Sequence, residues 1–303
     1  MTDLATDYGV LALRGTEARR FLNGQVSQDV LALGPDRVRL AGLHSIQGRT
    51  LAILQLLADG QSDLIALLPR ALLEDCVQRL RRYVLRAKVT LIDETPRWRI
   101  RPWWPTQLAG RTEFAALCAS GTAVGTVVRL SNEVYWRHAP DGRVLSLQPR
   151  DAADNSPHVA ADPSTALAWH RAEIACGLPW LTRATQDQFV AQMLNLDALE
   201  AISFTKGCYT GQEIIARAHY RGRVKRRLQR FETSQSAALQ PADRIEFTDG
   251  RRAEIVMAAP LEGGGQTFLA VTSLAGASPD PAIPAGGTRI DVRALPMPYV
   301  LPD

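Results

Sequence analysis

The sequence predicts a protein of mixed α and β structure (α+β) that divides into two or three domains. Its 303 residues exceed what one hydrophobic core usually spans. Its first ninety residues combine strand patterns with helix patterns, and from Gly222 onward short strands alternate with turns, which favours a small β-barrel or sandwich at the C-terminus. Hydrophobic residues make up 46% and charged residues 22%, as is typical of globular proteins.

The N-terminal third is expected to be mostly strands. Gly9–Leu13 is a short apolar strand, and Thr16 can cap a helix over Glu17–Asn23. Residues 38–68 are predicted to form three strands joined by two turns, at Ile46–Gly48 and Asp59–Gly60.

A helix and a further strand follow these three strands. The helix is predicted over residues 71–84 and the strand over 88–92. Apolar residues at helical spacing predict the buried face of the helix, with Cys76 as a core residue: Leu72, Leu73, Cys76, Val77 and Leu80.

The middle of the chain changes composition twice. Residues 95–105 hold three tryptophans, which we interpret as packing and interface residues, and three strands are expected over 122–130, 133–139 and 143–149. Residues 148–164, rich in Pro and Asp, are the predicted linker. A helix to about Cys176 should follow, capped by Ser164 or Asp162 with Pro163 at an early position. The C-terminal strands are expected at 226–233, 243–250, 252–260, 267–274 and 288–296.

Charge and cysteine content restrict the class of protein only loosely. A net charge of +4 is compatible with an anionic small ligand or with RNA. No two of the four cysteines are spaced as a CxxC pair, so we expect a reducing compartment, the cytoplasm. The N-terminus lacks a secretion-signal pattern, and no run of about 18 apolar residues predicts a membrane span.

One stretch, FTKGCYTGQEIIARAHYRGRVKRR over Phe204–Arg227, carries the chemistry. Thr210 and Glu213 fit a capping box, which predicts a helix with Ile214, Ile215 and Ala218 facing the interior. The nearby helix N-terminus and Lys206 would both favour a thiolate at Cys208. Alternatively, Cys208 is a small apolar residue filling a corner; a metal site would need partners that the nearby sequence lacks.

A run of basic residues follows the cysteine. It is either the solvated face of a helix and strand or a docking surface for carboxylates or phosphates. Only Tyr220 is available there for base stacking. The run consists of Arg217, Arg221, Arg223, Lys225, Arg226, Arg227 and Arg230.

KGCYTGQE, residues 206–213, with the following IIARAHYRGRVKR, resembles the signature of the YgfZ-type folate-binding proteins, relatives of the glycine-cleavage T-protein, an aminomethyltransferase. Residues 11–33, 173–181, 189–205 and 295–302 resemble other segments of this family. The resemblance implies a three-domain, T-protein-like ring around a central folate cavity. We expect a folate-cavity domain of residues 1–50 with 160–221, a middle α+β domain of residues 51–159, and a C-terminal β-barrel of residues 222–303.

The resemblance also implies a function. The protein would bind tetrahydrofolate or a one-carbon derivative and support assembly or repair of iron–sulfur clusters, including those of tRNA-thiolating radical enzymes. Its partners would be folate and iron–sulfur proteins or their assembly factors. Nucleic acid is not expected as a direct ligand, nor a membrane, and the protein is expected to be a monomer. The alternative is a folate-dependent one-carbon transferase of the aminomethyl type.

Site residues follow from the same resemblance. Cys208 and Lys206 would carry the chemistry within the motif Lys206, Gly207, Cys208, Tyr209, Thr210, Gly211, Gln212 and Glu213. A pterin ring needs aromatic walls, which Tyr8 and Trp169 would supply. Folate contacts are also expected from an amide at the pterin edge and two arginines at the glutamate tail: Gln192, Arg171 and Arg217.

Two departures from the family pattern limit this transfer. The T-protein has a catalytic aspartate in its early strand–turn–strand region, whereas residues 44–57 here contain no acid, so aminomethyl transfer from a lipoyl carrier looks lost. A transferase would have to use Cys208 or another group instead. The family also tends to have Cys where His44 stands, which is either a functional replacement or a tolerated surface change.

Overall fold

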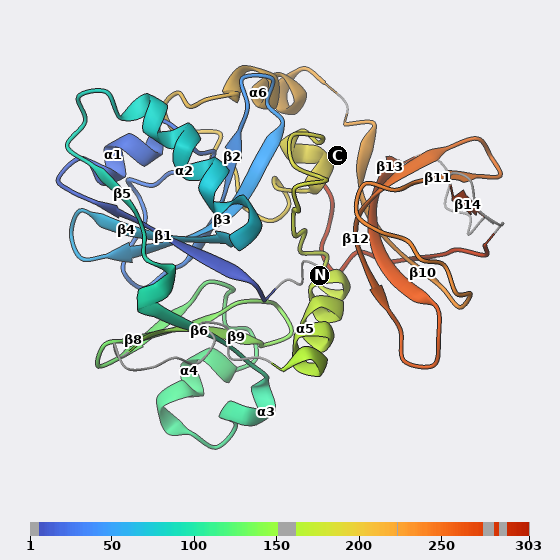
Figure 1. The fold of residues 1–303 in the computed structure, drawn as a ribbon, viewed down its shortest axis with the longest axis horizontal. Coiled ribbons are helices and arrows are strands. Elements are labelled where there is room, and N and C mark those ends of the chain that lie inside the picture. Colours follow the sequence, from blue (N-terminus) through green and yellow to red (C-terminus); the bar gives the residue numbers. More distant parts are fainter. Residues whose placement is uncertain (1–5, 151–161, 223, 275–281, 285–289, 303) are drawn as a thin grey trace.

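The computed structural model describes residues 6–150, 162–222, 224–274, 282–284 and 290–302. Most of the expected linker, residues 151–161, lies outside this range, as do Arg223 and residues 285–289. The described chain forms three antiparallel sheets with helices packed around them, so the prediction of a mixed α and β fold is confirmed (Figure 1). Among the described residues, no helix is long and apolar enough to cross a membrane.

The first sheet contains the early strands in the order β2-β3-β4-β1-β5. Both faces are largely buried, and α2 (Arg70–Val84) packs on the sheet through the apolar stripe predicted from its spacing, Cys76 included. The sheet runs across residue 50, where a domain boundary was expected; the division into domains stays a prediction. Its strands are β1 Tyr8–Arg14, β2 Arg39–His44, β3 Thr50–Asp59, β4 Asp63–Pro69 and β5 Thr90–Asp93, with α1 Ala18–Asn23 after β1.

The second sheet has four strands in the order β6-β9-β8-β7. Phe114 and Leu117 close one side of it against Tyr135, which gives this sheet a small core of its own. Its strands are β6 Trp98–Trp103, β7 Val127–Leu130, β8 Glu133–Arg137 and β9 Val144–Pro149; the short helices are η1 Thr95–Arg97, α3 Pro105–Leu108, η2 Thr112–Phe114 and α4 Ala115–Cys118.

The C-terminal sheet has six strands in the order β14-β11-β12-β13-β10-β15 and curls into a half-barrel around a core that includes Phe231 and Phe268 (Figure 1). The last expected strand, 288–296, is shorter than predicted, and β14 was not predicted. The strands are β10 Arg226–Thr233, β11 Arg244–Phe247, β12 Arg252–Pro260, β13 Gln266–Ser273, β14 Ala282–Pro284 and β15 Arg293–Leu295.

Helix α5 (Pro163–Ala175) lies between the second sheet and the curled sheet (Figure 1). Asp162 caps it as predicted, because its carboxylate accepts hydrogen bonds from the backbone N–H groups of Ser164 and Thr165, each at 3.0 Å. Pro163 is the first helical residue, where its missing N–H costs nothing. Helix α6 (Gln212–Tyr220) and the short η3 (Ala191–Leu194) complete the fold.

Candidate functional site

The signature loop, residues 206–213, places Cys208 at the surface. The alternative of a small residue filling a buried corner is therefore wrong. The predicted capping box is also wrong: α6 begins at Gln212, its N-cap is Gly211 in the left-handed conformation, and no side chain caps the helix. Cys208 thus lies four residues before the first helical residue, farther from the helix dipole than expected, since that field acts within the first turn.

Lys206 points into the protein rather than out beside the thiol. Its ammonium donates hydrogen bonds to the backbone carbonyls of Asn23, Val26 (2.8 Å) and Gln28 (2.9 Å), and lies 5.0 Å from the centre of the Tyr209 ring. Burial lowers the pKa of Lys206 to about 8, while the carboxylate of Asp29 acts in the opposite direction. Three acceptors use all three ammonium donors, so Lys206 fastens the signature loop to residues 23–28.

The signature loop packs directly on the turn between β2 and β3. Gly211 has φ +82°, and a Cβ there would lie 2.4 Å from the carbonyl oxygen of Ser45 and 3.1 Å from Cα of Gly48. Only glycine fits such a close approach with this backbone. Ile215 is fully buried beneath the loop as predicted, whereas Ile214, also predicted to face the interior, is 39% exposed.

His44, at the start of this turn, is fully buried, so a tolerated surface change is the wrong interpretation of it. Its ring lies 6.4 Å from that of Tyr209, and neither ring nitrogen has a hydrogen-bond partner among the residues that the structure describes. Burial lowers the pKa of His44 to about 3. The side-chain oxygens of Ser45 and Thr50 are likewise buried without partners, so polar atoms gather unpaired beneath the signature loop.

Gln192 in η3 is buried behind the same loop. Its amide nitrogen donates to the carbonyl of Ile215 in α6 at 2.7 Å, and its side-chain oxygen has no partner. The neighbouring residues of η3 are held by β10, because buried Arg227 donates to the carbonyl of Gln192 at 3.2 Å and pairs with both carboxylate oxygens of Asp197 at 2.9 Å. Gln192 therefore links α6 to the C-terminal sheet and keeps one free acceptor.

Two adjoining cavities lie against the first sheet and share three apolar wall residues, Leu40, Leu178 and Leu199. We call them together the cleft. The wide end, about 330 Å³, is lined in part by Arg37, Arg39, Cys176 and Tyr299. The narrow end, about 40 Å³, is lined in part by Tyr8, Gln55, His138, Glu173 and Trp180.

A buried polar network forms the wall of the narrow end. His138 contacts the Glu173 carboxylate through Nε2 at 2.9 Å, and Arg143 donates to the same oxygen at 2.6 Å. Burial alone would raise the pKa of Glu173, but His138 and Arg143 lower it to about 2. The carboxylate is therefore charged at neutral pH, and it holds α5 to residues 138–143, which connect β8 to β9.

Of the expected folate residues, the structure places only Tyr8 in the cleft. Its ring is 2% exposed and meets Trp180 edge-on at 4.8 Å, so little of its face is open. Trp169 lies behind the wall: it is fully buried, stacked on His138 at 5.4 Å, with the guanidinium of Arg143 4.3 Å from its ring centre. Neither cavity is lined by Trp169, Gln192, Arg171, Arg217, Lys206 or Cys208.

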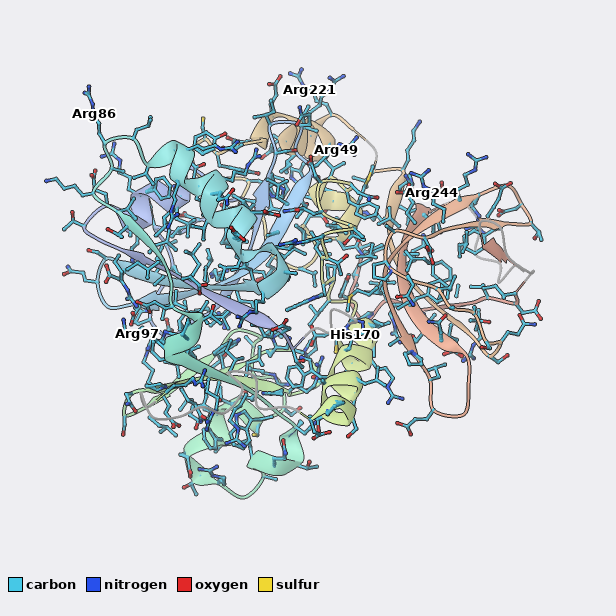
Figure 2. The ribbon with its side chains drawn as sticks, viewed as in Figure 1. Arg49, Arg86, Arg97, His170, Arg221 and Arg244 are labelled. Atoms are coloured by element: carbon cyan, nitrogen blue, oxygen red, sulfur yellow. The ribbon has the colours of Figure 1, made fainter. Side chains whose placement is uncertain are left out.

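The two arginines expected at the folate tail lie apart. Arg171 on α5 pairs with Glu262 at 3.1 Å, and Arg217 is exposed on α6. The basic run also divides: Arg227 is buried and Arg226 pairs with Glu254 at 3.0 Å, so neither belongs to a solvated face or docking surface. Arg217, Arg221 and Lys225 are exposed, and Arg221 lies with Arg49 at the α6 edge of the molecule (Figure 2).

Sequence reasoning missed the network residues Gln55, His138, Arg143 and Glu173. Gln55 carried a signal, because it is the lone polar residue in the apolar strand segment LAILQLL, and Glu173 opens the family-like segment EIACGLPWL. Nothing in the local pattern marked His138, which lines the cleft, or Arg143, which pairs with Glu173 behind it; the pairing of β8 with β9 brings both into place.

Comparison with known proteins gives consistent results. No protein-family model matches the chain. The tRNA-modifying protein YgfZ of Escherichia coli O45:K1 is 28% identical over 309 residues, covering 97% of this chain and 92% of the relative. The protein of the same name from Escherichia fergusonii is similar to the same extent. Among solved structures, glycine cleavage system aminomethyltransferase T from Bartonella henselae matches with a TM-score of 0.67 at 12% identity, covering 97% of this chain and 84% of that one.

Proposed function

From its full-length similarity to the YgfZ-type proteins and its T-protein-like fold, we propose that this chain binds tetrahydrofolate and supports tRNA modification. The same two similarities confirm the relation to the YgfZ-type proteins and the T-protein that the signature indicated. The finer proposal is that the protein is an accessory factor for assembly or repair of iron–sulfur clusters, including those of tRNA-thiolating enzymes. The single observation that carries the proposal is the similarity to YgfZ over 97% of the chain.

The cleft has the chemistry that a folate requires. Folate has a flat heterocycle with a hydrogen-bonding edge, an aromatic middle and an anionic glutamate tail. The narrow end offers polar groups on Tyr8 and Gln55, the middle is walled by leucines, and the wide end presents Arg37 and Arg39. In the described part of the chain, no carboxylate forms an ion pair with either arginine, so both guanidinium groups are free to bind an anion.

We therefore place the folate in the cleft, as the cavity of a T-protein-like ring, with its tail at Arg37 and Arg39. This replaces Arg171 and Arg217 in that role, because one is paired with Glu262 and the other lies on the outer surface of α6. Trp169 would act indirectly, by fixing His138, which lines the narrow end, and Arg143, which lies behind it. Bound tetrahydrofolate would supply a carrier of one-carbon groups.

Cys208 supplies an exposed thiol on a loop whose buried side is held by other parts of the chain. Lys206 and Gly211 hold the loop against residues 23–28 and the β2–β3 turn, so the thiol is presented by a rigid base. An accessible thiol on a fixed support suits contact with an iron–sulfur protein or its cluster. The alternative of a one-carbon transferase gains no support, since the β2–β3 turn beneath the loop carries no acid.

Folate placement is tested by calorimetric titration with tetrahydrofolate. Arg37→Ala and Arg39→Ala should each weaken binding roughly 10-fold through loss of a charge-assisted contact. Arg86→Ala, which removes an exposed arginine at the edge of the molecule that lines neither cavity, is the matched control and should bind as the wild type does (Figure 2). Equal affinity in all three variants would show that the glutamate tail does not bind at the wide end of the cleft.

The cellular role is tested by complementation of a bacterial strain that lacks its own YgfZ-type protein, with tRNA thiolation as the readout. Cys208→Ala should fail to restore thiolation, and Cys118→Ala, a partly exposed thiol on α4, should restore it. Full rescue by Cys208→Ala would show that the thiol is dispensable, and failure of the wild-type protein to rescue would contradict the proposed role.

A further inference from the structure

The narrow end of the cleft has room for the edge of a ligand rather than for a whole ring system. Its volume is about 40 Å³, and its lining includes Tyr8, Gln55, His138 and Trp180. A cavity needs roughly 10–15 Å³ to hold one water molecule, so this space takes the edge of a ligand, such as a single carbonyl group. Which polar group fits there depends on the direction of the hydrogen bonds in the wall.

The orientation of the Gln55 amide is fixed by its neighbours. The indole N–H of Trp136 can only donate, and it lies 3.0 Å from Oε1 of Gln55. His138 Nδ1 lies 3.3 Å from the same oxygen. The opposite orientation would set an amide N–H₂ group against the indole N–H. Oε1 of Gln55 therefore faces Trp136, and its amide nitrogen faces Tyr8.

This orientation determines what the Tyr8 hydroxyl can do. The amide nitrogen of Gln55 donates to the Tyr8 oxygen at 3.2 Å, so that oxygen acts as the acceptor and its own hydrogen remains available. Among the described residues, no acceptor for this hydrogen lies within hydrogen-bonding distance. Burial and the nearby Glu173 carboxylate raise the pKa of Tyr8 well above 10.0, so the hydroxyl keeps its proton.

We infer that the chain of hydrogen bonds from Trp136 through Gln55 to Tyr8 makes the Tyr8 hydroxyl a directed donor. This donor selects a neutral carbonyl oxygen at the narrow end of the cleft. A neutral acceptor is favoured because the Glu173 carboxylate lines this end, whereas its partner Arg143 does not. This inference rests on the proposed function, under which the acceptor is the 4-oxo group of the pterin ring. Tyr8 then contributes through its hydroxyl rather than as an aromatic wall.

The inference is tested by comparing tetrahydrofolate with an analogue whose 4-oxo group is replaced by an amino group, which donates instead of accepting. Wild-type protein should prefer tetrahydrofolate, and Tyr8→Phe, which keeps the ring, should reduce this preference about 10-fold. Tyr135→Phe removes a hydroxyl from the second sheet, outside the cleft, and should leave the preference unchanged.

A second variant separates hydrogen-bond direction from packing. Gln55→Glu keeps the size of the side chain but turns the group facing Tyr8 into an acceptor, which would draw the Tyr8 hydrogen away from the ligand. It should reduce the preference as Tyr8→Phe does, although the hydroxyl is still present. If Tyr8→Phe and Gln55→Glu both keep the wild-type preference for tetrahydrofolate, this inference is overturned and the proposed function still stands. Absence of tetrahydrofolate binding by the wild type would overturn the proposed function and this assignment with it.

Discussion

The buried His44 should make the protein markedly less stable in mild acid. Because His44 is fully buried and has no hydrogen-bond partner, its pKa falls from 6.5 to about 3 in the folded state. Between these two values the unfolded chain binds a proton that the folded chain does not, so stability falls as the pH falls. With 1.36 kcal/mol for each pKa unit, the loss from pH 7 to pH 5 is about 2 kcal/mol from this residue alone.

Replacing His44 by leucine should remove this loss. His44→Leu takes an unpaired polar ring out of the core, so the free energy of unfolding at pH 7 should stay the same or rise by about 1 kcal/mol. Urea unfolding at pH 7, 6 and 5, followed by circular dichroism, gives the slope for each variant, and His219→Gln on the exposed surface of α6 is the control. The reasoning is refuted if His44→Leu retains the wild-type slope between pH 7 and pH 5.

Three further substitutions test the supports of the site. Gly211→Ala should cost about 2 kcal/mol or more, since φ is +82° and the new Cβ would meet the Ser45 carbonyl, whereas Gly207→Ala has open space and should be near neutral in thermal melts. Lys206→Met should cost about 2–4 kcal/mol and speed proteolysis of the signature loop, because it leaves three carbonyls without their donor, while the exposed Lys225→Met should do neither. Glu173→Gln should reduce the acid sensitivity that arises below pH 4.5: the folded-state pKa is lowered to about 2, so the wild type loses about 3 kcal/mol from this group as the pH falls through that window, which urea unfolding of the wild type and of the variant at several pH values measures.

Local patterns predicted the helices and strands well where one apolar face decides the structure. The stripe Leu72, Leu73, Cys76, Val77 and Leu80 defined α2, and Asp162 with Pro163 marked the start of α5. The start of α6 was misplaced because Gly211 is held by the β2–β3 turn rather than by a hydroxyl cap. That contact joins residues more than 160 positions apart, so no local pattern could reveal it.

The site was predictable only in part for the same reason. KGCYTGQE and its flanks singled out Cys208 as a candidate thiol, and the structure places it at the surface. No local pattern revealed the cleft, because its walls come from the first sheet, the segment after α5 and the residues before Ala201, with His138 brought in by the second sheet. Lys206 illustrates the difference: its position in sequence suggests a partner for the thiol, while the fold uses its charge to bind three distant carbonyls.

Filling the cleft tests most directly whether folate binds there. Leu199 lines both the wide and the narrow cavity, so Leu199→Trp would block the point where they meet. Calorimetric titration with tetrahydrofolate should show binding to the wild type and to Cys208→Ala, and no binding to a Leu199→Trp protein that retains its circular dichroism spectrum. Wild-type affinity in Leu199→Trp would contradict the account and place the folate elsewhere.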